Sequence, residues 1–275
     1  MKYKLFVADM DGTLLNDDKQ LSEKNIQTIK KLPDFGIQFA IATGRHDSMI
    51  KSYLRHLNLK VPVISCNGAL VREPFSDHVL VAEQLSKEHS LKIIDLCKDM
   101  NVDFHIYGHN SIFGESLTNK MLYYDGLNET LPPEERTNLV IVPDTKETVV
   151  NEKEPLYKFI IFSERNHNRP DIFDRLADIE GLTACQSMTT LCDVMKGGIS
   201  KAYALNKLSE NLGIKRNKIA AIGDQLNDID LIEYAGLGIA VANAEDELKE
   251  KADVVTTSSN NEDAVSEAIE SFLFK

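Results

Sequence analysis

The stretch Leu5-Phe6-Val7-Ala8-Asp9-Met10-Asp11-Gly12-Thr13 combines a run of apolar residues with two closely spaced acids. Four apolar residues in a row predict a strand that is covered on both faces, as in a parallel sheet. Asp9 and Asp11 follow where this strand gives way to a turn. Two carboxylates this close repel each other unless a divalent cation neutralises one or a proton sits on the other. Gly12 permits a tight turn whose backbone N–H groups can face an anion.

Similar short apolar runs recur along the chain, and most of them end in polar residues. These runs are 39–42, 61–64, 219–222, 237–241 and 254–255. Amphipathic helical patterns lie between them, among them a leucine stripe over 205–212 that stops at Gly213, a good carboxyl-terminal cap. Strand–helix–strand repeats predict right-handed crossovers and an α/β fold with a doubly wound parallel sheet. Ligands of such sheets bind beyond the carboxyl ends of the strands, so the polar residues after each run are the candidates for a site.

Two groups of polar residues suit a phosphate. Thr43 and Gly44 follow the run at 39–42, and a hydroxyl beside a backbone N–H at a helix start forms a phosphate cradle. Lys201, just after two glycines, can add a positive charge. An acidic protein that accepts a phosphate dianion must build a local positive site, for which metal, lysine and helix amino termini are the available means.

A further acidic group follows the run at 219–222. Asp224 and Asp228 flank Asn227 there, and carboxylates are the ligands that a hard cation such as Mg²⁺ prefers. Taken alone, the two acids could equally cap a helix. Combined with the polar groups that follow the other buried strands, they favour a metal-dependent phosphate site.

The pattern of short apolar runs that end in polar residues changes between residues 81 and 188. Helices are predicted there at 91–100 and 170–179, and strands at 102–107, 139–142 and 157–162. No set of polar residues recurs at strand ends in this region. We therefore expect a core domain from residues 1–80 and 189–275, and an inserted α/β cap domain from residues 81–188, with 187–191 returning the chain to the core.

Composition excludes several classes of partner. The chain has 275 residues and a formal net charge of −12, which disfavours binding to nucleic acid or to an anionic membrane surface. No apolar run approaches the ~18 residues of a membrane span, and the amino terminus is not a signal peptide. Four scattered cysteines predict reduced, buried thiols in a cytoplasmic protein: Cys66, Cys97, Cys185 and Cys192. His105 and His109 have the spacing of a zinc helix, but Gly108 lies between them and no HExxH motif is present. We therefore expect both histidines on the cap surface or facing the substrate.

Four motifs carry a family resemblance. FVADMDGTLL, IATGR, KGGISKAYAL and IGDQLNDIDLI resemble the four motifs of the haloacid dehalogenase (HAD) superfamily of phosphohydrolases. ISCNGA and the tail AGLGIAVANAEDELKEKADVVTTSSNNEDAV look like its Cof-type branch, whose class IIB cap is inserted between the second and third motifs. Val241-Ala242 and Ala264 depart from the residues usual in that branch. Neither departure touches a proposed catalytic group.

The resemblance implies a mechanism and a metal. Asp9 would be the nucleophile that forms an aspartyl-phosphate, and Asp11 would protonate the leaving oxygen and later take a proton from water. Mg²⁺ would be held by the Asp9 carboxylate, the Asp11 backbone carbonyl and Asp224. Asp228 would bind the metal through water or orient the lysine.

The resemblance also implies how the substrate is held. The expected phosphate-binding residues are Gly12, Thr43, Gly44, Lys201 and Asn227. Arg45 would either contact the substrate or form a salt bridge. Asn67 and Gly68 are further candidates for substrate contacts.

The sequence therefore predicts a Mg²⁺-dependent phosphatase that hydrolyses small phosphorylated metabolites, sugar phosphates or similar compounds. Two other functions stay open: a class IIB sugar phosphomutase, which returns the phosphoryl group to its substrate, and a sensor that binds phosphorylated ligands without turnover. The complete set of reactive residues argues against the sensor.

Overall fold

The computed structural model describes residues 1–274 except 152, 164–170 and 189. The chain divides into two compact units. The core unit consists of residues 1–45, 52–81 and 200–275, and the inserted unit consists of residues 46–51 and 82–199. Each unit has a sheet and a hydrophobic cluster of its own.

A five-stranded parallel sheet forms the centre of the core unit, in the order β14-β13-β12-β1-β2. Its strands are β1 (Leu5–Ala8), β2 (Gln38–Ile41), β12 (Ile219–Gly223), β13 (Leu237–Ala240) and β14 (Val254–Val255). Leu5 pairs with Gln38 on one side and with Ile219 on the other. The strand order therefore reverses at β1, and such a switch point is where open parallel sheets bind their ligands.

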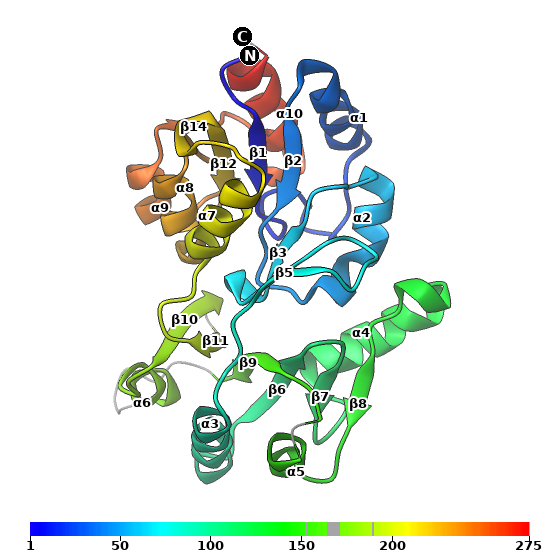
Figure 1. Ribbon diagram of the computed structural model, residues 1–275, viewed down its shortest axis with the longest axis vertical. Helices are drawn as coiled ribbons and strands as arrows, with labels where there is room; N and C mark the ends of the chain where they lie inside the picture. Colours follow the sequence, from blue (N-terminus) through cyan, green and yellow to red (C-terminus); the bar gives the residue numbers. More distant parts are fainter. Residues whose placement is uncertain (152, 164–170, 189, 275) are drawn as a thin grey trace. The chain divides into compact units, whose positions relative to one another are not determined.

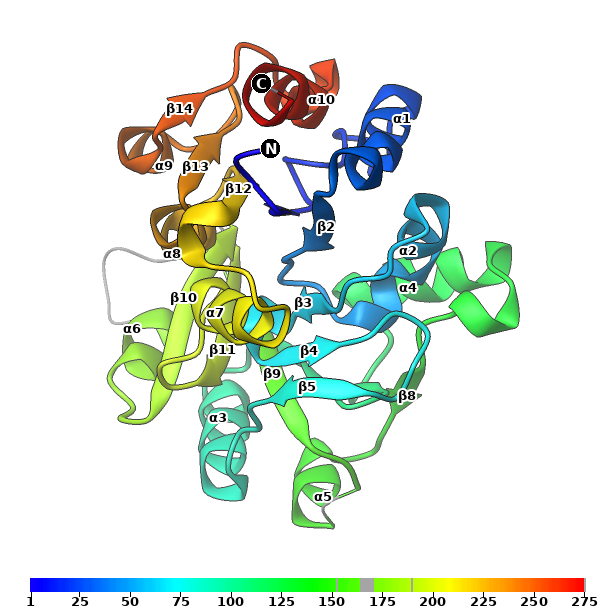
Figure 2. The same cartoon turned by 45° about the horizontal axis from the view of Figure 1, so that its top comes forward.

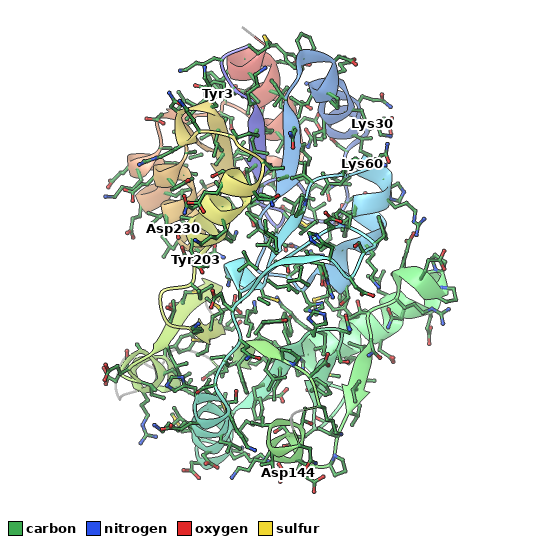
Figure 3. All side chains as sticks on the ribbon, in the orientation of Figure 1. Tyr3, Lys30, Lys60, Asp144, Tyr203 and Asp230 are labelled. Atoms are coloured by element: carbon green, nitrogen blue, oxygen red, sulfur yellow. The ribbon has the colours of Figure 1, made fainter. Side chains whose placement is uncertain are left out.

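Side chains alternate along β1, so Leu5 and Val7 lie on the same face of the sheet. Leu5 and Val7 point toward the cluster that includes Leu205 and Leu208 of α7 and Leu231 of α8. Figures 1 and 2 show α7 (Lys201–Asn211) and α8 (Ile229–Tyr234) beside each other, and Figure 3 labels Tyr203 of α7 and Asp230 of α8. The backbone N–H of Ala202 donates to the Asp230 carboxylate at 3.3 Å. The helices of this unit are α1 (Glu23–Lys31), α2 (Lys51–Leu57), α7 (Lys201–Asn211), α8 (Ile229–Tyr234), α9 (Asp246–Lys251) and α10 (Ala264–Ala268).

Short 3₁₀ and π segments lie between these elements. They are η1 (Leu32–Phe35), η2 (Asp47–Ile50), η3 (Cys66–Gly68), η5 (Arg216–Lys218), η6 (Leu226–Asp228), η7 (Asn260–Glu262) and the π-helix η8 (Ile269–Leu273). The predicted stop of the leucine stripe is confirmed, because α7 ends just before Gly213, which adopts φ +66°.

The apolar run at 61–64 does not form a full strand of the parallel sheet. β3 (Val63–Ser65) pairs antiparallel with β4 (Leu70–Arg72) in a three-stranded sheet that ends with β5 (Val79–Ala82). One parallel bridge, between Ala42 and Ile64, connects it to the end of β2. A sharp turn at 66–68 sends the chain back along β3, which accounts for the antiparallel pairing.

The inserted unit holds a six-stranded mixed sheet in the order β10-β11-β9-β6-β7-β8. The strands are β6 (Asp103–Gly108), β7 (Ile112–Gly114), β8 (Leu139–Ile141), β9 (Leu156–Phe162), β10 (Leu182–Met188) and β11 (Leu191–Lys196). One face carries the cluster with Phe104, Phe159 and Val194. Three helices insert apolar residues into this cluster: α3 (Lys87–Asp99), α5 (Thr145–Val150) and α6 (Ile172–Ala177). The predicted parallel core with an additional α/β domain is thus confirmed.

The helices of the inserted unit differ from the expected ranges at their ends. They are α3 (Lys87–Asp99), α4 (Asn119–Thr130), η4 (Pro133–Glu135), α5 (Thr145–Val150) and α6 (Ile172–Ala177). α3 starts earlier than predicted because the Ser86 hydroxyl accepts a hydrogen bond from the His89 N–H and caps the helix. Asp171 caps α6, and Pro170, expected in its first turn, lies outside the described residues.

The return to the core unit comes later than the sequence analysis placed it. Residues 191–199 belong to the inserted unit, because β11 pairs antiparallel with β9 and β10 over five or more residues each. The described residues of 187–191 are part of this hairpin and do not lead back to the core. Residues 46–51 also group with the inserted unit. The insertion thus spans 82–199 where 81–188 was expected.

The cysteines fit the expected free thiols with one exception. Cys66, Cys97 and Cys192 are buried, and burial raises the pKa of the Cys97 thiol to about 12. Cys185 is partly exposed because it lies on the edge strand β10. None of the helices formed by the described residues combines the length and the apolar character that a membrane crossing requires.

The second face of the inserted sheet carries buried polar groups. Lys158 and Asp193 form an ion pair at 2.8 Å there, with both side chains almost fully buried. His105 is only 1% exposed, and neither of its ring nitrogens has a hydrogen-bond partner among the described residues. It was expected on the surface or facing a substrate. It instead lies on strand β6 with its ring 4.8 Å from that of Phe162.

We predict that His105 makes the inserted unit sensitive to acid. Burial lowers the pKa of His105 from 6.5 to about 4, so the fold favours the neutral ring. This stability is fully present above pH 6.5 and is lost as the pH falls toward 4. Between pH 7 and pH 5 the free energy of unfolding should fall by about 2 kcal/mol from this group alone.

Urea unfolding of wild type and His105→Leu at pH 7 and pH 5 measures this contribution. The variant should lose less stability on acidification than wild type. His56→Gln, which changes an exposed ring, serves as the control and should behave like wild type. An equal pH dependence of His105→Leu and wild type would show that the buried ring contributes nothing.

Candidate active site

Several of the predicted polar residues meet at the carboxyl edge of the core sheet. Asp9 follows β1, Thr43 follows β2 and Asp224 follows β12. Because these strands are parallel, their carboxyl ends lie along the same edge. The backbone N–H of Asp9 donates to the Ile222 carbonyl at 3.0 Å, which extends the β1–β12 pairing up to the acid. The switch point of the sheet therefore places the two acids beside each other.

Lys201 joins two of the acids inside the protein. Its Nζ lies 2.6 Å from Asp9 Oδ1 and 2.6 Å from Asp228 Oδ1. All three residues are buried, with exposures of 5% or less. Lys201 reaches this position because Ser200 caps α7 and makes Lys201 the first residue of the helix. Asp228 is held in place by the backbone N–H groups of Asp224 and Gln225, which donate to its Oδ2 at 3.2 Å.

Burial, together with the neighbouring charges, shifts the pKa values of this cluster. Burial raises the pKa of Asp9 well above its usual value, and the charges of Asp228 and Asp224 add to this although Lys201 opposes it. Burial and the charge of Asp228 also raise the pKa of Asp224, to about 6. Burial alone would lower the pKa of Lys201, but the two carboxylates that it contacts hold it above its usual value.

These residues fit a divalent cation. One carboxylate oxygen each from Asp9, Asp224 and Asp228 lies within 4.8 Å of the others. Three carboxylates and the single ammonium of Lys201 leave two negative charges uncompensated in a buried place, and a doubly charged cation with a preference for oxygen ligands would neutralise them. The donor set and its charge are those expected of a site for a divalent metal ion.

The turn after β1 is fitted closely around Asp224. Gly12 adopts φ +81°, and a Cβ at this position would overlap the Asp224 carboxylate. The Thr13 hydroxyl donates to Asp224 Oδ1 at 2.8 Å. Asn243, which follows β13, donates from Nδ2 to the Gly12 carbonyl at 2.8 Å. A glycine is required here both by the left-handed backbone and by the space.

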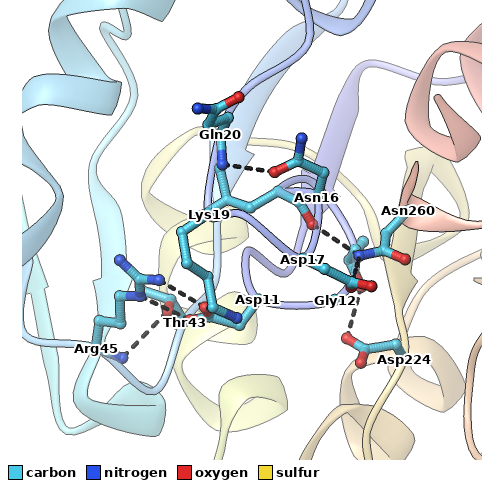
Figure 4. Close-up of polar contacts among 12 residues, drawn as sticks. Asp11, Gly12, Asn16, Asp17, Lys19, Gln20, Thr43, Arg45, Asp224 and Asn260 are labelled. Atoms are coloured by element: carbon cyan, nitrogen blue, oxygen red, sulfur yellow. Dashed lines mark hydrogen bonds and ion pairs between the residues drawn. The ribbon is translucent and has the colours of Figure 1, made fainter. Parts of the chain in front are cut away.

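Asp11 points away from the other acids, toward two cations (Figure 4). Arg45 donates from Nε to Asp11 Oδ2 at 2.7 Å and from Nη2 to Oδ1 at 2.5 Å, and Lys19 Nζ lies 3.1 Å from Oδ1. Burial would raise the pKa of Asp11, but Arg45 and Lys19 hold it well below its usual value. The Asp11 carboxylate is thus outside the acidic cluster. This position is compatible with the family resemblance, which implied the backbone carbonyl of Asp11 as the metal ligand and not its carboxylate. Of the two alternatives for Arg45, the structure shows the salt bridge.

The Thr43 loop differs from the expected helix start. Thr43 is buried, and its Oγ1 accepts a hydrogen bond from the Arg45 N–H at 3.1 Å. Gly44 lies in a bend and not at the first turn of a helix. The next helical segment, η2, starts only at Asp47, because His46 has an extended backbone and caps it by accepting a hydrogen bond from the Ser48 N–H.

Asn67, Gly68 and Asn227 come together beside this loop. Cys66, Asn67 and Gly68 all have positive φ, which makes the turn between β3 and β4 unusually sharp. The Asn67 N–H donates to the Thr43 carbonyl at 3.1 Å, and Asn227 Nδ2 donates to Asn67 Oδ1 at 3.1 Å. A Cβ on Gly68 would overlap the carbonyl of Ser200, so this glycine lets the turn approach the start of α7.

Sequence reasoning missed three residues of this site: Thr13, Lys19 and Asn243. Thr13 stands inside the first motif and could have been found from its place after Gly12. Asn243 follows an apolar run, as the other site residues do. Lys19 carries no such signal, because it reaches Asp11 through a left-handed backbone at φ +60°.

Comparison with known proteins agrees with this geometry. The family described as haloacid dehalogenase-like hydrolase matches residues 6–269. Pyridoxal phosphate phosphatase YbhA of Escherichia coli (strain K12) is 29% identical over 99% of this chain and 100% of its own length. The 5-amino-6-(5-phospho-D-ribitylamino)uracil phosphatase YcsE of Bacillus subtilis (strain 168) is 32% identical over 97% of this chain and 94% of its own. The structure of a HAD subclass IIB sugar phosphatase has a TM-score of 0.80 at 23% identity and covers 99% of this chain and 100% of its own, which establishes the shared fold.

The chain therefore belongs to the haloacid dehalogenase-like hydrolases. The resemblance drawn from the four motifs is confirmed, and so is the prediction of a phosphatase.

We predict that the buried Lys201 stabilises the metal-free core unit. Replacement by Met leaves the Asp9 and Asp228 carboxylates buried without their shared counter-charge. Breaking a buried pair in this way should lower the free energy of unfolding by about 3–5 kcal/mol. Urea unfolding at pH 7 in the presence of a chelator measures the loss.

Lys19→Met provides the comparison, because Lys19 pairs with Asp11 through a side chain that is 40% exposed. Its loss should cost less than about 1 kcal/mol. If both substitutions cost the same small amount, the Lys201 contacts do not support the fold.

Proposed function

We propose that this protein is a Mg²⁺-dependent phosphomonoester hydrolase that acts on small phosphorylated metabolites through an aspartyl-phosphate on Asp9. The observation that carries the proposal is the buried cluster of Asp9, Asp224, Asp228 and Lys201 at the switch point of the core sheet. The four free cysteines of the protein and its net charge of −12 fit a cytoplasmic enzyme that binds neither nucleic acid nor membranes.

Asp9 is the proposed nucleophile. Its carboxylate forms a bond to the phosphorus of the ester while the bond from phosphorus to the leaving oxygen breaks. Lys201 holds Asp9 Oδ1 at 2.6 Å and thereby fixes the direction of the carboxylate. The metal, when bound by Asp9, the Asp11 carbonyl and Asp224, supplies positive charge against which the phosphate oxygens can be held.

Asp11 is the proposed proton carrier. In the first step the protonated form of Asp11 gives a proton to the leaving alkoxide. For Asp11 to be protonated, Arg45 and Lys19 must first move away from its carboxylate. In the second step its ionised form takes a proton from the water that attacks the aspartyl-phosphate, so that Asp9 is restored and phosphate is released. The contacts in this structure favour the ionised form.

The remaining predicted site residues would hold the phosphate group. We propose the Gly12 and Gly44 N–H groups, the Thr43 hydroxyl, Lys201 and the Asn227 amide for its oxygens. Asn67 and Gly68 are proposed to act at the same place, since Asn67 accepts a hydrogen bond from Asn227. The relatives act on pyridoxal phosphate and on a phosphorylated ribitylaminouracil according to their names, and sugar phosphates or similar monoesters are the proposed class here.

Phosphate release from a panel of phosphorylated metabolites tests the reaction. Wild type should release phosphate only with Mg²⁺, and Asp9→Asn should release none, because the amide has the shape of the carboxylate but is not a nucleophile. Both proteins are compared after a chelator wash and after addition of Mg²⁺.

Each other outcome has a distinct meaning. Release that persists in Asp9→Asn would exclude the aspartyl-phosphate. An isomerised product that depends on a bisphosphate activator would identify a phosphomutase. Binding of phosphorylated compounds by a folded wild type without any turnover would identify a sensor.

If Asp11 is the proton carrier, the loss of kcat in an Asp11 variant should depend on the leaving group of the substrate. Asp11→Ala should lower kcat by about 10²–10⁴-fold for an alkyl phosphate, which needs a proton on its leaving oxygen. The loss should be much smaller for p-nitrophenyl phosphate, whose leaving group departs as a stable anion. An equal loss for both substrates would remove Asp11 from this role.

A further inference from the structure

Asn243 links the turn that follows the nucleophile to the last part of the chain. Its Nδ2 donates to the Gly12 carbonyl at 2.8 Å, and its Oδ1 accepts from the Asn260 N–H at 2.8 Å. Both hydrogen-bonding groups of the amide are therefore used, and each is used on a different segment. Asn243 follows β13 at the same sheet edge as the reacting residues.

Asn260 holds the other end of the same turn (Figure 4). It is buried, and its Nδ2 donates to the Leu15 carbonyl at 3.1 Å and to Asp17 Oδ1 at 3.0 Å. The pair Asn243–Asn260 thus binds the turn at Gly12 and again at 15–17. Hydrogen bonds from two side-chain amides, one at each end of this turn, restrict its backbone more than either bond alone would.

Gly12 is the residue of this turn that most needs such restraint. A glycine moves easily between backbone conformations, and here it must hold φ +81° beside the Asp224 carboxylate. The peptide before Gly12 contains the Asp11 carbonyl and the Gly12 N–H, and the peptide after it contains the carbonyl that Asn243 binds. Thr13 is already held by Asp224, so the bond from Asn243 completes the set of contacts that fixes Gly12.

We propose that Asn243 is a positioning residue for phosphoryl transfer, which fixes the peptide groups on both sides of Gly12. It touches no reacting atom and acts through the Gly12 carbonyl. The inference rests on the proposed function, because the Asp11 carbonyl and the Gly12 N–H are the groups assigned there to the metal and the phosphate. A residue that orients the ligands of a metal site in this way typically changes metal affinity or activity by about 10–100-fold.

Two substitutions separate this role from simple support of the fold. Asn243→Asp keeps the size of the side chain and the acceptor for Asn260, but it loses the donor to Gly12. Asn243→Ala loses both bonds. The control is Asn261→Ala, since Asn261 donates to Asp17 Oδ2 at 2.9 Å in the same network and belongs to no part of the proposed site.

Two readouts are measured for each protein. Steady-state phosphate release gives kcat and KM, and the rise in melting temperature on addition of Mg²⁺ reports metal binding without turnover. Both Asn243 variants should lose about 10–100-fold in kcat with KM within about threefold of wild type. Both should also be stabilised less by Mg²⁺, although the charge added in Asn243→Asp would by itself attract the cation. Asn261→Ala should match wild type.

Three results would overturn the proposal. Wild-type kcat and Mg²⁺ stabilisation in both variants would show that Gly12 needs no help from Asn243. A lower melting temperature of the metal-free variants with unchanged kcat would show a structural role alone. A wild type that releases no phosphate would instead remove the proposed function, and this inference with it. If Asn243→Ala does not fold, Asn243→Asp alone decides between these results.

Discussion

The contact of Lys201 with Asp9 and Asp228 is the constraint on which the core unit depends. A charge buried without a partner is costly, so each of these three residues tolerates burial only because the others are present. Their meeting requires β1 beside β12 and the first turn of α7 above both strand ends. The ammonium does not balance all the acids nearby, however, since Asp224 belongs to the same cluster. The fold is therefore built around a place that attracts a cation and, through it, a phosphate group.

Most of the core site could be predicted from the sequence because the chemistry follows the strands. Asp9, Thr43 and Asp224 each come just after a buried apolar run, and a parallel sheet gathers such positions at one edge whatever their distance along the chain. Lys201 could be singled out because two glycines precede it, whereas its place at the start of a helix capped by Ser200 is seen only in the structure. The motifs then assigned a role to each residue, which the pattern of strands alone does not.

Other parts lay beyond the sequence because they depend on tertiary contacts. The chain returns to the core unit later than expected because β11 pairs with β9. No local pattern in the sequence of Leu191–Lys196 predicts this pairing. The helix expected at Gly44 is displaced because His46 provides the cap further along. The position of Asp11 is set by Lys19 and Arg45, of which the first reaches it through a backbone conformation that a lysine seldom adopts. Contacts between distant loops leave no periodic signal.

The position of β1 between β2 and β12 has a consequence for how the protein is made. Leu5 pairs with Ile219, so this inner strand of the core sheet leaves the ribosome more than 200 residues before β12, one of its two neighbours. At about 5–20 residues per second this wait lasts on the order of 10–40 s. The segment 82–199 forms one continuous stretch of the inserted unit and is complete before β12 is synthesised. We expect it to acquire structure while the first strand still lacks its partner, which makes the exposed edge of β1 a natural target for a chaperone on the nascent chain.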